Sequence, residues 1–143
     1  MNYERKIEIR WADCDINRHV RHSAYYDYGA HARVRFIADA GFDEYKLSTL
    51  QLGPVIFNEQ CHFIREIRMN DTIRVNMLLD EMNDDGSKWK IHHEIFNQKD
   101  EKVAHITLSG AWMDTSKRKL TIPPKPLASS FALLERGDDY KRK

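Results

Sequence analysis

The chain contains little cysteine, little glycine and proline, and almost no net charge. Its 143 residues include two cysteines, Cys14 and Cys61, which are too few for a disulfide framework and indicate a reducing compartment. Lysine and arginine total 23 residues against 22 aspartates and glutamates, which gives a formal net charge of +1. Because no basic field surrounds such a chain, we expect no nucleic-acid partner.

Long hydrophobic runs are also missing, and so are several familiar catalytic motifs. The first residues, M-N-Y-E-R-K, lack the apolar core of a signal peptide. No apolar stretch approaches the roughly 20 residues that a membrane span requires. We therefore expect a cytoplasmic protein with no membrane partner. The chain also has no G-x-S-x-G, P-loop or G-x-G-x-x-G sequence, so these hydrolase and nucleotide-binding motifs are excluded.

What remains is ordinary globular sequence, with 41% hydrophobic and 31% charged residues. We assign residues 1–143 to a single domain, in which residues 120–143 form a C-terminal tail. Apolar and polar residues alternate at the start of the chain, which predicts a half-buried strand with Ile7, Ile9 and Trp11 on its buried face.

A long helix is predicted for residues 24–40. Neither proline nor a turn cluster interrupts this stretch, and four side chains recur at helical spacing: Tyr25, Tyr28, Ala32 and Phe36. Ser23 is the expected N-cap and Gly41 the expected C-cap. Gly29 lies inside the helix, where glycine is unfavourable, so we expect another backbone to approach closely there.

The second half of the chain has the alternation and turn residues of β-structure. Four strands are predicted, joined by hairpins into an antiparallel meander: residues 55–67, 72–82, 88–96 and 103–113. The sequence N-D-D-G-S at 83–87 is the clearest hairpin turn. In the tail we expect one docked helical turn with Phe131, Leu133 and Leu134, and frayed residues from 137 to 143.

This order of elements predicts an α+β fold in which one antiparallel sheet wraps around one long central helix. A single curled sheet leaves its outer face and its edges uncovered. Trp89, Trp112 and the two-faced strand at 55–67 therefore indicate that another subunit covers apolar surface. We expect at least a dimer.

The polar loop between the first strand and the helix carries most of the plausible chemistry. Asp15 can serve as a general base, or as a nucleophile on a carbonyl carbon. Backbone N–H groups at the helix start, near His22 and Ser23, can hold the developing oxyanion. The alternative is an ordinary loop aspartate that forms an Asx-turn.

Other side chains of the loop allow two further interpretations. Asn17 can orient water or a carbonyl group, and His19 can shuttle a proton, although each also fits an ordinary turn. A metal site is the other interpretation, on four side chains: Asp13, Cys14, His19 and His22. Their spacing matches no strong zinc pattern, so we expect no metal there.

The segment W-A-D-C-D at 11–15 resembles the D-C-D stretch of 4-hydroxybenzoyl-CoA thioesterases, which have the hotdog fold. The segment D-I-N-R-H-V at 15–20, followed by Tyr25, resembles the D-x-N-x-H-V signature of acyl-carrier-protein thioesterases and their acyl-CoA relatives. The resemblance covers roughly residues 5–114. It implies catalytic roles for Asp15, Asn17 and His19.

The resemblance also implies a substrate site and a class of substrate. The oxyanion donor would be a backbone N–H near His22 and Ser23, with Tyr25 beside the substrate. The substrate would be an acyl-CoA or an acyl-carrier protein, and the enzyme a homodimer or homotetramer. No metal or other cofactor is expected, since coenzyme A belongs to the substrate.

Two departures from the relatives leave the substrate open. Relatives often have two asparagines after H-V, where this chain has Arg21 and His22, and Arg18 stands where glycine or glutamine is common. Two alternatives on the same fold also remain open: an enoyl-CoA hydratase or dehydratase, and a non-catalytic acyl-binding module. The hydratase signature resembles D-x-N-P-[IL]-H, whereas His19 follows Asp15 by four residues.

Overall fold

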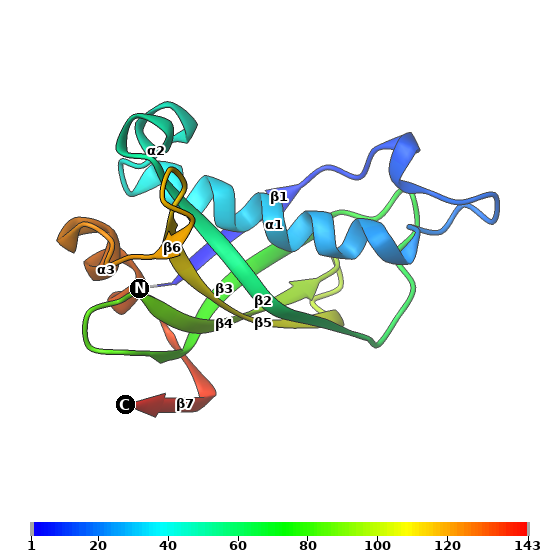
Figure 1. The fold of residues 1–143 in the computed structure, drawn as a ribbon. Coiled ribbons are helices and arrows are strands. Elements are labelled where there is room, and N and C mark those ends of the chain that lie inside the picture. Colours follow the sequence, from blue (N-terminus) through cyan, green and yellow to red (C-terminus); the bar gives the residue numbers. More distant parts are fainter. Residues whose placement is uncertain (1, 143) are drawn as a thin grey trace.

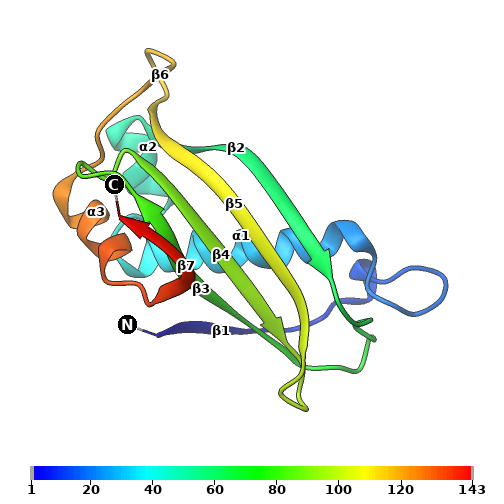
Figure 2. The same cartoon turned by 90° about the horizontal axis from the view of Figure 1, so that it is seen from below.

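A computed structural model describes the backbone of residues 2–142 and the side chains as far as Gly137. One sheet dominates the molecule, and its main strands follow the order β1-β3-β4-β5-β2 (Figures 1 and 2). The strands are β1 (Tyr3–Ile7), β2 (Leu52–Phe63), β3 (Ile73–Met82), β4 (Lys88–Phe96), β5 (Lys102–Asp114), β6 (Lys119–Leu120) and β7 (Arg136–Arg142). The helices are α1 (His22–Asp39), α2 (Glu44–Leu50) and α3 (Lys125–Ala132), preceded by the short 3-10 helix η1 (Trp11–Asp13).

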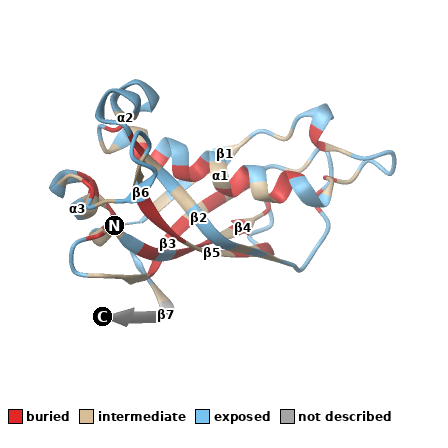
Figure 3. Ribbon diagram, in the orientation of Figure 1, coloured by how far each residue is buried: buried red, intermediate tan, exposed pale blue. Residues whose placement is uncertain are grey.

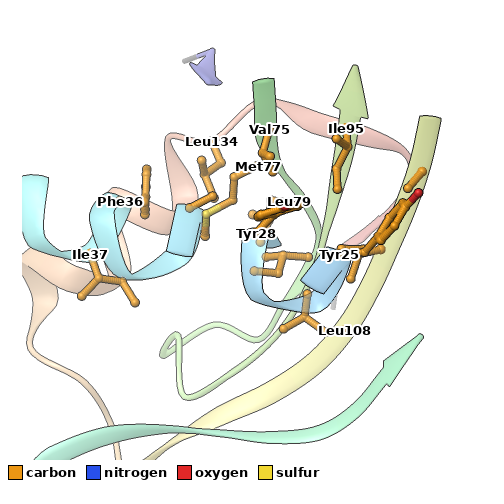
Figure 4. Close-up of a cluster of buried hydrophobic side chains, with 14 of the residues drawn as sticks. Tyr25, Tyr28, Phe36, Ile37, Val75, Met77, Leu79, Ile95, Leu108 and Leu134 are labelled. Carbon is orange, nitrogen blue, oxygen red and sulfur yellow. The ribbon is translucent and has the colours of Figure 1, made fainter. Parts of the chain in front are cut away.

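The curled sheet wraps around α1, as the sequence predicts (Figure 1). The buried side of α1 faces the sheet, and its outer side is exposed (Figure 3). All four helical positions expected in the core are buried: Tyr25, Tyr28, Ala32 and Phe36. Figure 4 shows Phe36 from α1 and Met77 and Leu79 from β3 directed into the same apolar cluster. Burial of this stripe provides most of the helix's stability.

Both ends of α1 differ from the simplest expectation. The N-cap is Arg21, which makes no side-chain capping hydrogen bond, and Ser23 lies inside the first turn. The prediction of Ser23 as N-cap is therefore wrong. At the other end, the N–H of Phe42 donates to the carbonyl of Ile37, and Gly41 has a φ of 97° just after the cap residue. This is a Schellman motif, in which glycine takes the left-handed position.

Gly29 makes room for side chains rather than for another backbone. A Cβ atom at this position would lie 3.1 Å from Cδ2 of His93 and 3.2 Å from Cδ1 of Ile106. His93 itself is fully buried between α1 and the sheet. Its Nδ1–H donates to the carbonyl of Asn76 at 2.7 Å, so its Nε2 accepts from Arg33 at 3.1 Å. The predicted close approach at Gly29 is present, but side chains approach the helix there, and not another backbone.

The β3–β4 and β4–β5 hairpins follow the predicted turns, but the expected meander of four strands is wrong, because β2 pairs with β5 at the far side of the sheet and not with β3. β4 has the predicted bounds, and β3 and β5 agree with the prediction to within one residue at each end. β3 pairs antiparallel with β4, and β4 with β5. β2 pairs antiparallel with β5 and forms the edge of the sheet, with an irregularity between Ile56 and Asn58. The predicted strand at 55–67 is shifted, because β2 starts at Leu52 and ends at Phe63.

The first strand is shorter than predicted. β1 ends at Ile7, and Trp11 belongs to η1 with 83% of its surface exposed. The expected burial of Trp11 is therefore wrong. Asp13 is the last residue of η1 and is buried. Burial is possible because Arg10 and Tyr28 donate hydrogen bonds to its carboxylate.

The C-terminal tail is more ordered than predicted. α3 brings Phe131 against Trp89 and Trp112, at ring-centroid distances of 5.7 and 5.9 Å. These tryptophans are therefore covered by the chain itself, which contradicts the expectation that a second subunit covers them. Leu133 is exposed, whereas Phe131 and Leu134 are buried.

The segment expected to be frayed forms β7, which pairs in parallel with β3. β1 leaves this part of the β3 edge free because it pairs only with residues 73–77. Lys143 lies outside the described residues. Across the part of the chain that is described, no helix has both the length and the apolar character needed to cross a membrane.

Candidate active site

The loop before α1 is anchored at Asp13. One carboxylate oxygen, Oδ1, accepts from the Arg10 guanidinium at 2.8 Å, and Oδ2 accepts from the Tyr28 hydroxyl at 3.0 Å. Burial raises the pKa of Asp13, but the hydrogen bonds from Arg10 and Tyr28 outweigh it, so that this pKa lies below its ordinary value. Burial and the neighbouring Asp13 carboxylate raise the pKa of Tyr28, so its hydroxyl remains a donor.

Beyond this anchor the chain forms a tight hairpin from Cys14 to Val20. The N–H of Asp15 donates to the carbonyl of His19 at 2.8 Å, and the N–H of Arg18 donates to the carbonyl of Asp15 at 3.0 Å. Arg18 has a φ of 66°, which closes the turn. Figure 1 shows the hairpin extending past the N-terminal end of α1 and away from the sheet. The hairpin therefore presents its tip to the surroundings.

The Asp15 carboxylate is oriented by the backbone of its own hairpin. Its Oδ1 accepts from the N–H of Asn17 at 2.9 Å and from the N–H of His19 at 3.2 Å. The Asx-turn interpretation of Asp15 is therefore correct as a description of the local structure. Among the residues that the structure describes, none donates a hydrogen bond to Oδ2, and the residue is exposed. One oxygen is thus held while the other is available for chemistry.

The side chains of Asn17 and His19 do not meet the Asp15 carboxylate. Asn17 is exposed and contributes its backbone N–H. The Nε2 of His19 lies 3.2 Å from Oε2 of Glu66, and its backbone bridges to Arg68. The structure therefore brings the three predicted catalytic residues together through the main chain. Glu66 is a partner of His19 that its sequence context does not reveal.

The start of α1 presents unsatisfied donors. Because Arg21 provides no side-chain cap, the N–H groups of His22 and Ser23 donate to no acceptor within the described chain. The Ser23 hydroxyl is already occupied, since it accepts from the Arg21 guanidinium at 2.8 Å. These N–H groups and the positive end of the helix dipole favour negative charge at this point.

Aromatic side chains form the wall beside the helix start. The Phe63 ring at the end of β2 lies 4.7 Å from the His22 ring and 4.9 Å from the Tyr25 ring, measured between centroids. Tyr25 is buried, and its hydroxyl donates to the carbonyl of Arg65 at 3.3 Å. The predicted substrate-binding residues His22 and Tyr25 thus share one neighbour, Phe63, which the sequence pattern did not single out.

Two hollows flank this region, and Asp15 lines neither of them. A groove of about 480 Å³ between β1 and α1 is lined by residues that include Asp13, Asp27 and His31. A second hollow of about 380 Å³ is lined by charged residues of the β2–β3 connection, including Arg65 and Arg68. Asp15 is therefore exposed outside both hollows.

Cys14 is poorly suited to act as a nucleophile. Burial, together with the nearby Asp13 and Asp15 carboxylates, raises the pKa of the Cys14 thiol above its ordinary value. A raised pKa leaves less of the reactive thiolate at neutral pH. The candidate catalytic groups of this loop are therefore the Asp15 carboxylate, the Asn17 amide and the His19 ring, and not the Cys14 thiol.

Comparisons with known proteins agree with this architecture. The chain resembles a putative esterase from Aquifex aeolicus, with 27% identity over 81 residues, which are 57% of this chain and 62% of that relative. A Staphylococcus aureus protein solved in complex with CoA superposes with a TM-score of 0.85 at 11% identity, over 92% of this chain and 82% of the other. A 1,4-dihydroxy-2-naphthoyl-CoA thioesterase from Synechocystis gives 0.82 at 13% identity, over 94% and 98% of the two chains.

These structures establish that the chain has the hotdog fold. The model of the Thioesterase-like superfamily matches residues 9–131, which include the hairpin, α1 and the main strands β2–β5. The chain therefore belongs to the Thioesterase-like superfamily, as the resemblance of its loop implies. It spans 62% of the length of the curated relative that it matches.

Proposed function

We propose that this protein hydrolyses acyl-CoA thioesters, or the equivalent thioesters of an acyl-carrier protein, with Asp15 as its key catalytic residue. The observation that carries the proposal is the arrangement of Asp15 and the helix start. A carboxylate with one oxygen free lies in the loop that leads into the uncapped N–H groups of α1. Hydrolysis of a thioester needs both a group that activates the attack and donors for the oxyanion.

In the proposed reaction, the thioester carbonyl oxygen points at the N–H groups of His22 and Ser23. Attack on the carbonyl carbon places negative charge on that oxygen, and the helix start stabilises it. The Asp15 carboxylate removes a proton from water, which attacks the carbonyl carbon, and the C–S bond breaks to release the thiol and the acid. In the other form of the reaction, Asp15 itself attacks the carbonyl carbon, the C–S bond breaks, and the thiolate leaves as the anhydride forms. Water then hydrolyses the anhydride, which releases the acid and restores the Asp15 carboxylate.

Asn17 and His19 would support Asp15 in two ways. Their N–H groups hold Oδ1, which leaves Oδ2 for the proton or the carbonyl carbon. The exposed Asn17 amide would orient water or the substrate, and His19 would assist proton transfer beside Glu66. The reaction as proposed uses no metal or other cofactor, because coenzyme A enters as part of the substrate.

We also propose that the site is completed in a homodimer or a homotetramer. β2 is an edge strand, and several apolar side chains on it and just after it are exposed: Ile56, Phe57, Phe63 and Ile64. Trp11 and Ile16 in the loop are exposed as well, at 83% and 96%. A partner that covers these groups would also enclose the acyl chain beside α1.

The direct test of this function is thiol release from short, medium, long and aromatic acyl-CoAs by the parent protein and by Asp15→Asn. Loss of one well-placed oxyanion donor costs about 3 kcal/mol, and removal of the Asp15 charge should cost at least as much. We therefore expect kcat/KM to fall by a factor of about 100 or more. Asp84→Asn, at an exposed position of the 83–87 turn, is the matched control and should retain parental turnover.

The possible results separate the reaction from the residue. Equal turnover by the parent and Asp15→Asn would remove Asp15 from the mechanism while keeping the thioesterase. The absence of turnover on every CoA ester and carrier-protein ester would contradict the proposal. Water addition to an enoyl-CoA, followed by its absorbance, would then identify a hydratase.

A further inference from the structure

A second group of chemically active side chains lies on the outer face of the sheet, opposite α1. His92 and Glu94 come from β4, and His105 comes from β5. The register pairs Glu94 directly with His105, which places His92 diagonally across from it on the same face. One ligand atom from each of the three side chains lies within 4.8 Å of the other two. No group of the proposed active site is among them.

His92 is already oriented as a metal-ligating histidine is. It is 7% exposed, and its Nδ1 lies 2.8 and 2.9 Å from the two carboxylate oxygens of the buried Asp80. Since a carboxylate accepts, Nδ1 donates to Asp80, and Nε2 is the ring nitrogen that is left to bind an ion. Metal-bound histidines characteristically donate their other N–H to a carboxylate, which fixes the tautomer and the ring orientation.

The strand β7 covers His92 and Asp80. A Cβ atom on Gly137 would collide with Oδ1 of Asp80 and Cε1 of His92, so only glycine lets the β7 backbone lie over this pair. The buried pair is therefore covered on one side, while Glu94 and His105 remain partly accessible. An ion would enter from the side of these two residues.

His105 is available as a ligand. Its ring stacks on that of His92, with 4.6 Å between centroids and 14° between planes, and no described residue forms a hydrogen bond with its nitrogens. Nitrogen ligands around tetrahedral zinc lie about 3.3 Å apart, so rotation of the free His105 ring is needed to bring it onto the ion.

Glu94 is the third candidate ligand, and in the structure it forms an ion pair with Lys102. Its Oε2 lies 2.5 Å from Nζ of Lys102, and its Oε1 accepts from the Asn76 amide at 2.9 Å. The Lys102 side chain is 38% exposed, so it can swing into solvent when another cation takes its place. The Asn76 contact can meanwhile hold the carboxylate in position.

We propose that His92, Glu94 and His105 form a binding site for a zinc-like divalent cation, with Asp80 as the partner that orients His92. Two imidazole nitrogens and one carboxylate oxygen suit Zn²⁺ or Co²⁺ better than the all-oxygen shells preferred by Mg²⁺ and Ca²⁺. Water would complete the shell. The ion would link β4 to β5 and, through Asp80, to β3, and would thus stabilise the sheet.

The test is titration of the untagged protein with Zn²⁺ by calorimetry, and with Co²⁺ by optical spectroscopy. We expect one equivalent to bind, and we expect His105→Ala and Glu94→Gln each to weaken binding at least about ten-fold. Glu94→Gln preserves the size of the side chain, so it keeps the test valid if His105→Ala is poorly folded. Lys102→Met removes the competing charge and should tighten binding several-fold.

His31→Ala is the matched control, since His31 lies on α1 and is exposed. It should bind zinc as the parent does. Zinc should also raise the Tm of the parent and of His31→Ala, but not that of His105→Ala. Parental affinity in both His105→Ala and Glu94→Gln would overturn the proposal, and so would the absence of saturable binding to the parent or a loss of binding in His31→Ala alone.

Discussion

At the scale of single residues, His93 shows how burial turns a titratable group into a structural one. Burial and the neighbouring Arg33 charge lower the pKa of His93 to about 3. The neutral ring satisfies both of its nitrogens, since Nδ1 donates to the Asn76 carbonyl and Nε2 accepts from Arg33. An ordinary histidine has a pKa near 6.5, so the folded and unfolded states bind protons differently. Stability must therefore depend on pH.

The sign of this dependence follows from the lowered pKa. Between pH 6.5 and about 3 the unfolded chain binds a proton at His93 that the folded protein does not, so stability falls as the pH falls. From pH 7.5 to 5.0 the loss due to this residue is about 2 kcal/mol. We expect His93→Gln, which does not titrate, to be less stable at pH 7.5 but to lose correspondingly less stability on acidification.

Urea unfolding of the parent and of His93→Gln at both pH values measures this difference. The pKa of His105 is also lowered and contributes with the same sign, but it does so in both proteins and cancels in the comparison. An identical pH dependence of the parent and the variant would show that His93 is not the group responsible.

The sequence gives uneven information about individual residues. Helical spacing correctly predicts the buried positions of α1, because one face must meet the sheet. It does not predict Asp13 or Trp11, since the burial of a carboxylate depends on distant donors such as Tyr28, and a short turn breaks the alternation at Trp11. For the same reason, the pairing of His19 with Glu66 has no local signal.

At the scale of elements, α3 is the part of the fold that the sequence predicts least well. The apolar pattern indicates a docked turn around Phe131, but it does not say what that turn covers. The structure shows Phe131 packed against Phe36, Trp89 and Trp112, with ring centroids 5.7 to 5.9 Å apart. α3 therefore closes one end of the core, and the predicted tail is part of the structural unit.

Removal of the Phe131 ring should uncover this end of the core. Large-to-small changes at buried aromatic residues cost about 3–5 kcal/mol, and we expect Phe131→Ala to fall in this range. Water would then reach Trp89 and Trp112, so their fluorescence should shift to longer wavelength, whereas the exposed Trp11 adds a constant background.

Leu133→Ala provides the control, because Leu133 follows α3 directly and is 63% exposed. We expect its stability and emission to remain near those of the parent. If Phe131→Ala had parental stability in urea and an unshifted fluorescence spectrum, α3 would not cover this end of the core.

At the scale of the whole molecule, the proposed assembly uses the edge of β2. The order β3-β4-β5 is predictable from alternation and turn residues, because each of these hairpins joins neighbours in sequence. The pairing of β2 with β5 is not local, and neither is the parallel pairing of β7 with β3. What covers the exposed apolar side chains of β2 is likewise a question of assembly.

A charge placed on this edge should separate the proposed subunits. Phe57 is 57% exposed and lies at the irregularity of β2, so Phe57→Asp should leave the protomer folded while it disfavours an apolar interface. We expect light scattering to give the mass of a dimer or tetramer for the parent and a lower mass for Phe57→Asp. Thioester hydrolysis should decrease with the loss of the oligomer.

Ile122→Asp serves as the control for this experiment. Ile122 is 64% exposed but lies between β6 and α3, away from the edge of β2. The mass of the Ile122→Asp variant in solution should match that of the parent. A monomeric parent, or a Phe57→Asp variant with unchanged mass, would rule out this edge as the interface.

The chain of polar groups through Arg33 has a consequence for how the helix and the sheet fit together. The Arg33 guanidinium contacts Glu59 of β2 at 3.4 Å and His93 of β4 at 3.1 Å, and its side chain is 10% exposed. Apolar packing alone tolerates small displacements, but a slide of α1 by one turn, about 5.4 Å, would leave a buried cation without either partner. The contacts of Arg33 therefore fix the position of α1 along the sheet. They also fix the position of the Asp15 hairpin, which precedes α1.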